Sequence, residues 1–427
     1  MAKRRMKQPA KVKATEHVLS VLELGWHGDG VAELDGKKIF VPFTLAGESV
    51  RAAVSGSRAE IIEILEAAPD RISPPCPHFG TCGGCAVQHL AMPAYHDWKR
   101  QIIEVALANQ DIEASVAPMI DAHGNGRRRV TLHVRYEDGR VQAGFMQAYS
   151  HRLIDIDHCP ILVPELANAT DIARDLARAL SKNNKPLDIH LTASESGLDC
   201  SVRGAVELDM DARMDLSDCA SNHDLARISL DGELVLERRS PVLTFGVAKL
   251  ALPPGGFLQA TKAGEDTLSR LVLEAVGDVD RVADLYCGVG PFALRLAARS
   301  SVLAVDNDSA AINALKHAAD HTLGQKPIRT EVRDLSSNPL YVDELNGVDA
   351  VVFDPPRAGA QAQVLEIIEA KVNTVVAVSC NPASFAHDAS ILTGGGYLLE
   401  SVTPVDQFRY AGHVELVGVF RRKKMFL

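Results

Sequence analysis

The stretch Asp284-Leu-Tyr-Cys-Gly-Val-Gly-Pro-Phe-Ala293 decides the fold of the C-terminal part of the chain. It continues the apolar run 281–285, and its two glycines let the backbone turn tightly and approach a ligand. Pro291 suits the first turn of the helix that comes next. The stretch is therefore typical of a buried strand that runs through a glycine-rich loop into a helix, with a ligand at the loop.

The ligand of this loop has two alternatives. The spacing G-x-G-x-x-A matches a dinucleotide fingerprint, in which Asp306, at the end of the next apolar run, would bind a ribose. That interpretation describes an NAD-dependent oxidoreductase. Asp284 stands four residues before the first glycine, where its carboxylate would crowd a pyrophosphate but would suit the ammonium group of S-adenosylmethionine. The loop therefore favours the methyl donor over NAD.

Short apolar runs and helical stretches alternate outward from this loop, from about residue 264 onward. The runs are nearly continuous and cover residues 281–285, 301–305, 349–353 and 374–379. Such runs are typical of parallel strands that crossover helices bury on both faces. We therefore predict an α/β fold whose C-terminal part, residues 251–427, is a doubly wound, Rossmann-like domain with ligands at the carboxyl ends of its strands.

The N-terminal half of the chain has a different pattern. Residues 14–70 alternate apolar and polar positions in short runs separated by glycines, which predicts a small OB-like β-barrel. A basic tail, residues 1–13, precedes it. Residues 71–250 mix strand-like and helical segments, which predicts a central α+β domain with a helix at 93–110 that could pack on the C-terminal domain.

The composition is that of an ordinary globular protein of 427 residues, with 46% hydrophobic and 23% charged residues. No apolar run approaches the roughly 18 residues that span a membrane, and no secretory signal follows the basic tail. We therefore expect a cytoplasmic protein with no membrane association. The net charge of −10 argues mildly against nucleic-acid binding, although Arg127, Arg128 and Arg129 form a local basic run.

Two further strand ends carry reactive groups. The run 349–353 leads into Asp354-Pro-Pro-Arg357, and the run 374–379 leads into Cys380. A D-P-P motif at this place is common in methyltransferases that act on nucleobases. Carbon 5 of uracil is too weakly nucleophilic to take a methyl group directly, but addition of a thiolate at C6 makes it nucleophilic. Cys380 is therefore the candidate nucleophile, and we expect its position to lower the pKa of its thiol.

Such a reaction also needs a base, because the C5 proton must leave before the cysteine can be expelled. Glu415 lies in Gly412-His-Val-Glu-Leu416, which opens the last apolar run of the chain. A carboxylate that enters a hydrophobic strand is either an edge residue that faces water or a functional group. Beside a cysteine and a D-P-P-R strand end, the functional interpretation is favoured.

Five ordered motifs resemble those of the RNA uracil-5-methyltransferase family: F-x-Q at Phe257, D-L-Y-C-G-x-G, D-P-P-R, S-C-N-P and H-V-E. The resemblance implies that Cys380 is the nucleophile and Glu415 the base. It also implies a cofactor and substrate pocket lined by Gln259, Tyr286, Pro291, Asp306, Asp334 and Asp354. The chain departs from the family pattern at Thr261, where Asn is usual, and at Phe408-Arg-Tyr-Ala411, which replaces F-P-x-T.

Four cysteines form a separate candidate site. They are spaced as C-x5-C-x2-C with a fourth 74 positions later, and they are Cys76, Cys82, Cys85 and Cys159. A four-thiolate set holds either tetrahedral zinc or an iron–sulfur cluster, and the spacing does not decide between them. Family members that act on ribosomal RNA resemble this chain in carrying a [4Fe-4S] cluster at such a site, which favours iron. The N-terminal barrel resembles the TRAM module, an RNA-binding fold of the same family.

The leading hypothesis is S-adenosylmethionine-dependent methylation of uridine C5 in RNA, with a target base flipped from its stack. The cysteine set favours 23S ribosomal RNA and a place in rRNA processing. One alternative is a transfer RNA uridine-5 methyltransferase, and another is an RNA-binding iron–sulfur protein with a degenerate methyltransferase domain. RNA is the expected partner, with the arginine run 127–129 as candidate contacts, and no obligate protein partner is evident.

Overall fold

The computed structural model describes residues 14–137, 139–180, 185–204 and 208–423, so the basic tail predicted at 1–13 lies outside the described residues. The chain forms two compact units. Within the described residues, the first comprises 14–80, 84–98 and 410–412, and the second comprises 81–83, 99–409 and 413–423. No helix in these ranges is long and apolar enough to cross a membrane.

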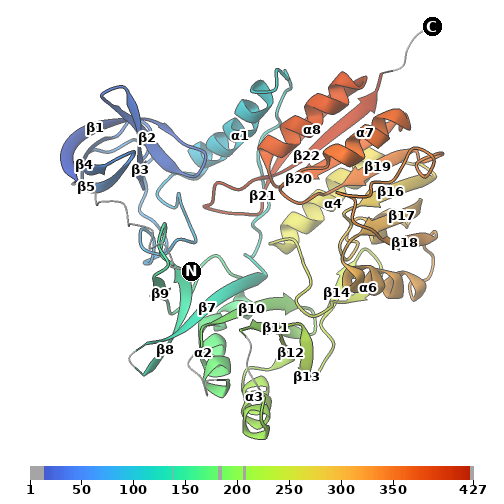
Figure 1. The fold of residues 1–427 in the computed structure, drawn as a ribbon, viewed down its shortest axis with the longest axis horizontal. Coiled ribbons are helices and arrows are strands. Elements are labelled where there is room, and N and C mark those ends of the chain that lie inside the picture. The colour runs from blue at the N-terminus through green and yellow to red at the C-terminus, as the bar shows by residue number, and fades with distance from the viewer. Residues whose placement is uncertain (1–13, 138, 181–184, 205–207, 424–427) are drawn as a thin grey trace, which may run out of the picture. The chain divides into compact units, whose positions relative to one another are not determined.

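The first unit contains a closed barrel of five strands, drawn in blue in Figure 1. The strands follow the order β1-β2-β3-β5-β4, and their bounds are β1 Thr15–Leu24, β2 Asp29–Leu34, β3 Lys37–Pro42, β4 Ser49–Ser55 and β5 Arg58–Glu66. Alternate side chains point inward, where Leu19, Val41 and Val50 contribute to a buried core. The predicted N-terminal β-barrel is confirmed, while its likeness to the TRAM module stays a prediction.

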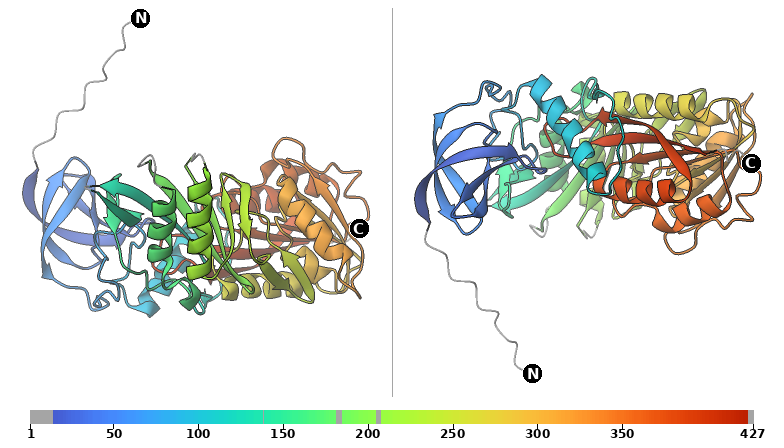
Figure 2. Two further views of the ribbon diagram at one scale, coloured as in Figure 1. Left: turned by 90° about the horizontal axis from the view of Figure 1, so that it is seen from below. Right: turned by 90° about the horizontal axis from the view of Figure 1, so that it is seen from above.

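The middle of the chain forms a seven-stranded sheet within the second unit. Its order is β13-β12-β11-β10-β7-β8-β9, with bounds β7 Arg129–Glu137, β8 Arg140–Met146, β9 Leu153–Asp155, β10 Leu187–Ser194, β11 Gly197–Arg203, β12 Leu225–Leu230 and β13 Glu233–Glu237. Two green helices, α2 (Ala169–Ala179) and α3 (Met210–Asn222), lie side by side on one face (Figure 2). Leu132 and Ile189 point into that core, so the alternating Arg129 and His190 belong to the opposite face.

The C-terminal part of the second unit is built on an eight-stranded sheet of order β18-β17-β16-β19-β20-β22-β21-β6. Strands β16 to β20 run parallel to one another, and β22 is inserted antiparallel between β20 and β21. The bounds are β6 Ile120–Asp121, β16 Arg281–Leu285, β17 Ser301–Asp306, β18 Ile328–Val332, β19 Ala350–Phe353, β20 Thr374–Ser379, β21 Tyr397–Asp406 and β22 Glu415–Arg422. A hairpin of β14 (Val242–Phe245) and β15 (Ala248–Ala251) precedes β16 in the chain.

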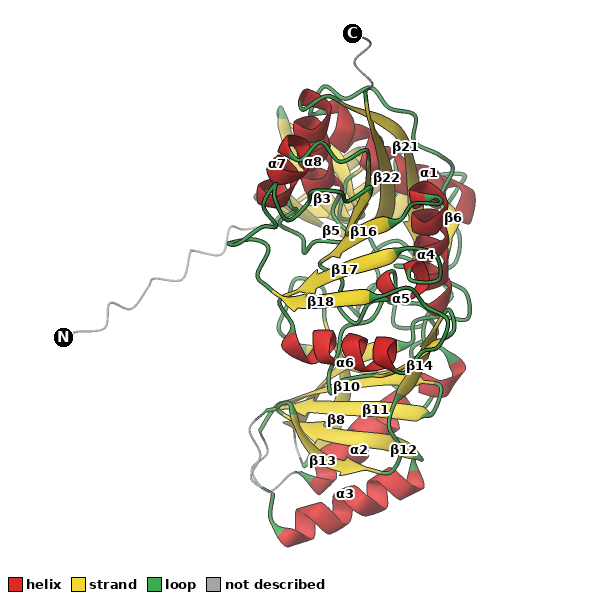
Figure 3. Ribbon diagram, turned by 90° about the vertical axis from the view of Figure 1, so that its right-hand side faces the viewer, coloured by secondary structure: helices red, strands yellow, loops and turns green. Residues whose placement is uncertain are grey.

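Helices cover both faces of the eight-stranded sheet, as Figure 3 shows. Their bounds are α4 Lys262–Val276, α5 Ala293–Leu296 and α6 Ser309–Asp320 on one face, and α1 Met92–Ala108, α7 Gln361–Glu369 and α8 Pro382–Gly394 on the other. Val352 of β19 packs in the first of these cores and its neighbour Val351 in the second. Since both faces are buried, the apolar runs of these strands are continuous. The predicted doubly wound fold is confirmed, and Ile103 of α1 packs in its second core.

Candidate active site

The glycine-rich loop joins β16 to α5 and is attached to the end of β17. The backbone N–H of Gly288 donates to Asp306 Oδ2 at 2.8 Å. Gly290 has a φ of 79°, and a Cβ there would lie 2.4 Å from Cδ1 of Leu315. Only glycine suits that position. The Asp306 carboxylate therefore holds the loop at the carboxyl edge of the sheet.

Three acidic residues, Asp284, Asp306 and Asp354, stand on the neighbouring strands β16 and β17 and directly after β19. Burial, together with the charges of Asp354 and Asp306, raises the pKa of Asp284 well above its usual range. Burial and the charge of Asp306 likewise raise the pKa of Asp354 to about 7. Mutual repulsion of this kind is relieved when positive charge is brought close. The edge of the sheet is therefore suited to a cationic ligand.

Cys380 and Glu415 meet at the same edge. β20 ends at Ser379, which pairs with Leu416 of the antiparallel strand β22. The next residues in this register are Cys380 and Glu415, so they lie across from each other. Glu415 is 3% exposed, and burial together with the charge of Asp354 raises the pKa of its carboxyl to about 8.

The thiol of Cys380 is not activated in this structure. Burial and the charges of Glu415 and Asp354 raise its pKa to about 11, against the opposing effect of Arg357. The expectation that the strand end lowers the thiol's pKa is therefore wrong. Its physical reason is that the strand end is partly buried and lies beside two carboxyl groups, both of which disfavour a thiolate.

A buried glutamine that the sequence does not single out connects these groups. Gln407 Nε2 donates to Gln259 Oε1 at 2.6 Å and to Glu415 Oε1 at 3.2 Å. Gln259 Nε2 donates in turn to Asp354 Oδ2 at 3.1 Å. Three residues that the motifs predict, Gln259, Asp354 and Glu415, are therefore brought into one hydrogen-bonded chain by Gln407.

Lys99 is a second residue that the sequence does not single out. It lies in α1 with a fully buried side chain, and its positive charge lowers the pKa of Glu415. In the sequence it is one lysine of an amphipathic helix, which normally indicates a solvent-exposed position. Its hydrogen-bond partners are Asp406 and the carbonyls of Phe408 and His413. They stand about 300 residues away in the chain, so no local pattern identifies Lys99.

The other predicted cofactor residues follow the same strand ends. Tyr286 comes directly after β16 with a φ of 58°, and burial, with the charges of Asp388 and Asp334, raises the pKa of its hydroxyl to about 12. Asp334, two residues after β18, accepts hydrogen bonds from Ser336 N and Ser337 Oγ. Pro291, in the glycine-rich loop, accepts at its carbonyl from Arg295. Their contacts with a cofactor stay a prediction.

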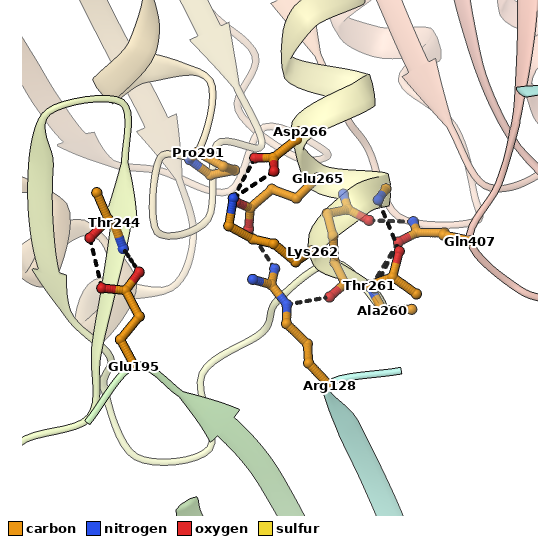
Figure 4. Close-up of polar contacts among 12 residues, drawn as sticks. Arg128, Glu195, Thr244, Ala260, Thr261, Lys262, Glu265, Asp266, Pro291 and Gln407 are labelled. Carbon is orange, nitrogen blue, oxygen red and sulfur yellow. Dashed lines mark hydrogen bonds and ion pairs between the residues drawn. The ribbon is translucent and has the colours of Figure 1, made fainter. Parts of the chain in front are cut away.

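The three adjacent arginines have different surroundings. Arg128 is 5% exposed and pairs with Glu265 of α4 (Figure 4). Its Nε also donates to the carbonyl of Gln259. Arg127 and Arg129 instead line a cavity of about 290 Å³ on the face of the seven-stranded sheet that α2 and α3 leave uncovered. The guanidinium of Arg129 lies 4.2 Å from the centre of the exposed Phe257 ring. Arg128 is therefore held by a buried ion pair, whereas Arg127 and Arg129 line the cavity.

The cysteines of the predicted four-thiolate site are divided between the two units. Cys76 and Cys85 belong to the first unit, and Cys82 and Cys159 belong to the second; each is partly buried. Among the residues that the structure describes, no group of three or more His, Cys, Asp or Glu side chains is placed to hold a metal ion. The site and its [4Fe-4S] cluster stay predictions.

Known proteins are similar to this chain in sequence and in fold. A family model described as tRNA (Uracil-5-)-methyltransferase matches residues 254–424. An uncharacterized RNA methyltransferase of Brucella suis biovar 1 is 44% identical over 404 residues, which cover 95% of this chain and 97% of the relative. The 23S rRNA (uracil(1939)-C(5))-methyltransferase of Halomonas elongata is 33% identical over 445 residues, covering 96% of this chain and 92% of the relative.

Among solved structures, the tRNA (uracil-54, C5)-methyltransferase of Pyrococcus abyssi, in complex with S-adenosyl-L-homocysteine, is similar with a TM-score of 0.71. The two chains are 22% identical, and the match covers 95% of this chain and all of the other. At that identity the likeness is one of fold. It extends over almost the whole chain rather than over the C-terminal sheet alone.

Proposed function

The chain belongs to the RNA uracil-5-methyltransferase family, and we propose that it methylates carbon 5 of a uridine in 23S ribosomal RNA, with S-adenosylmethionine as the methyl donor. The observation that carries the proposal is the register of β20 and β22, which sets Cys380 opposite Glu415. A nucleophile and a base at one edge of the sheet are the two groups that covalent methylation of a pyrimidine carbon needs.

The proposed reaction uses these two side chains in sequence. Cys380 gives its thiol proton to water, and its Sγ then bonds to C6 of the flipped uracil while the electrons of the C5–C6 double bond move into an enolate. Carbon 5 then takes the methyl group that S-adenosylmethionine supplies. Glu415 removes the remaining C5 proton, and the electrons of that C–H bond re-form the double bond as Sγ leaves. The products are 5-methyluridine, S-adenosylhomocysteine and the Cys380 thiolate, with the C5 proton on Glu415.

The raised pKa of Cys380 suits a thiol that becomes reactive only after S-adenosylmethionine has bound. Carboxyl groups cause part of that rise, so a cation bound beside them lowers the thiol's pKa. S-adenosylmethionine is such a cation, and the acidic cluster that includes Asp284 is the place proposed for its positive charge. The residues proposed to line its pocket are Gln259, Tyr286, Pro291, Asp306, Asp334 and Asp354.

RNA is proposed to enter over the open face of the seven-stranded sheet. Guanidinium groups bind phosphate oxygens, and an exposed aromatic ring stacks on an unpaired base. The cavity lined by Arg127, Arg129 and Phe257 offers both. Ribosomal rather than transfer RNA is proposed because the relative at 33% identity is named for 23S rRNA.

An iron–sulfur cluster is proposed at Cys76, Cys82, Cys85 and Cys159. Four thiolates are the donor set that a [4Fe-4S] cluster requires, and all four cysteines are only partly buried. The cluster takes no part in the methyl transfer. Its proposed role is to hold the loops that carry the four cysteines.

The direct test is mass-spectrometric mapping of 5-methyluridine in ribosomal and transfer RNA from cells that lack the protein. Loss of one 23S rRNA site, restored by the wild-type gene but not by Cys380→Ala, is the expected result. Loss confined to transfer RNA supports the alternative substrate. Full restoration by Cys380→Ala contradicts the covalent mechanism. With Glu415→Gln, a covalent complex with RNA should accumulate and survive denaturing electrophoresis, because the adduct forms but cannot lose its C5 proton.

A further inference from the structure

The amide of Gln407 has only one orientation that its surroundings accept. Its Oε1 lies 2.8 Å from Ala260 N and 3.4 Å from Thr261 N, at the start of α4 (Figure 4). Backbone N–H groups can only donate, so the oxygen must face them and the NH₂ group must face away. The NH₂ group therefore donates to Gln259 and to Glu415.

The orientation of the Gln407 amide also fixes which groups donate to the carboxyl groups of Asp354 and Glu415. Because Gln259 Oε1 accepts from Gln407, its NH₂ group is left to donate to Asp354 Oδ2. At each end of this hydrogen-bonded series an amide N–H donates to a carboxyl oxygen, which stabilises that group as a carboxylate. Glu415 Oε1 accepts this bond, while Oε2 is buried with no hydrogen-bond partner among the described residues.

Space for this amide is built into α4. A Cβ at Gly264 would lie 2.8 Å from both Cβ and Oε1 of Gln407. Thr261, where the chain departs from the family pattern, caps the helix with its hydroxyl and gives its backbone N–H to Gln407. Thr261 has no side-chain amide, and the amide that its backbone N–H contacts is that of Gln407.

We propose that Gln407 is a positioning residue for proton abstraction: it anchors one oxygen of Glu415 and favours the carboxylate, which leaves Oε2 to take the proton from C5. This inference rests on the proposed function. The other charged groups that act on Glu415 are Asp354, which opposes its ionisation, Lys99, which favours it, and the thiol of Cys380 opposite. Among these, Gln407 and Lys99 are the groups that offset its burial.

The test compares pH profiles of RNA methylation between about pH 6 and 9.5. Gln407→Met keeps the length of the side chain and removes the donor. Gln407→Glu keeps an acceptor for Ala260 N but also removes the donor, and it serves if the Met variant does not fold. The matched control is Gln363→Met, because Gln363 is equally buried but its amide bonds to the backbone of Leu340 rather than to a carboxyl group.

The acid limb of the profile should move up by about one pH unit in Gln407→Met, which is about a tenfold loss of rate on that limb. It should move further in Gln407→Glu, and both variants should accumulate the covalent RNA adduct. The Gln363→Met profile should match that of the wild type. Profiles of both Gln407 variants that superpose on the wild type, with no extra adduct, overturn the inference. A wild-type enzyme that forms no 5-methyluridine instead overturns the proposed function itself.

Discussion

Lys99 Nζ lies 2.6 Å from Asp406 Oδ1, and neither side chain is exposed to solvent. The same ammonium group donates to the carbonyl oxygens of Phe408 and His413. These two carbonyls lie near the two ends of the segment that joins β21 to Glu415, the first residue of β22. One buried lysine therefore holds both ends of the connection that delivers the proposed base.

Replacing Lys99 by Met should destabilise the protein by about 3–5 kcal/mol, because the carboxylate of Asp406 is left buried without its cation. Denaturant unfolding measures the change. The control is Lys316→Met, since Lys316 and Asp320 are also 2.6 Å apart but exposed, and exposed pairs contribute little to stability. Equal losses for the two variants would mean that burial does not decide the strength of the Lys99 contact.

The fold could be predicted from the sequence where the pattern is local. Continuous apolar runs such as 374–379 followed from burial on both faces of the sheet, and alternating runs in 14–70 followed from burial on one. Cys380 and Glu415 were found because their motifs stand at strand ends. Their register across β20 and β22 comes from the antiparallel insertion of the last strand, for which the apolar runs carry no signal.

The supporting contacts of the site could not be predicted, because they join residues that are distant in sequence. Gln407 and Gln259 are 148 positions apart, and Lys99 and Asp406 are 307 apart. A single glutamine or lysine in a run of mixed composition carries no signal of such a contact. The raised pKa of Cys380 has no local signal either, since it depends on burial and on the carboxyl groups of Glu415 and Asp354.

The buried carboxyl of Glu415 should make the stability of the protein depend on pH. Its pKa is about 8 in the folded protein, against an ordinary value of 4.5. A carboxyl with a raised folded pKa adds stability below its unfolded pKa and loses it as the pH rises through the folded one. Between pH 4.5 and 8 the folded state therefore holds a proton that the unfolded chain releases.

Glu415→Gln should remove this dependence, because a glutamine has no proton to lose and its oxygen can still accept from Gln407. We expect the melting temperature of the wild type to fall more than that of the variant between about pH 6 and 9. Differential scanning calorimetry without RNA measures both. Parallel melting curves across this range would show that the carboxyl of Glu415 is not strongly perturbed.

Cys159→Ser should abolish the iron–sulfur cluster if the proposed thiolate set is right. Anaerobically purified wild-type protein should contain about four iron atoms per chain and absorb visible light at about 400 nm. The variant should lose both signals, whereas Cys200→Ser, in the core of the seven-stranded sheet, should keep them. Zinc in place of iron, with no visible absorbance, would contradict the iron assignment and leave the four-thiolate site intact.

Substitution of Arg129 should affect RNA binding, whereas substitution of its neighbour Arg128 should affect stability. Arg129→Ala should weaken RNA binding and lower the slope of log affinity against log salt by about 1, as expected for one phosphate contact, with little effect on folding. Arg128→Ala should cost about 2 kcal/mol of stability through its bond to Glu265, although Arg295 still pairs with that carboxylate. Filter binding over a range of salt concentrations, together with denaturant unfolding, separates the two effects. If Arg129→Ala lowers stability and leaves the salt slope unchanged, its stacking on Phe257 is structural and the cavity beside it does not bind the RNA backbone.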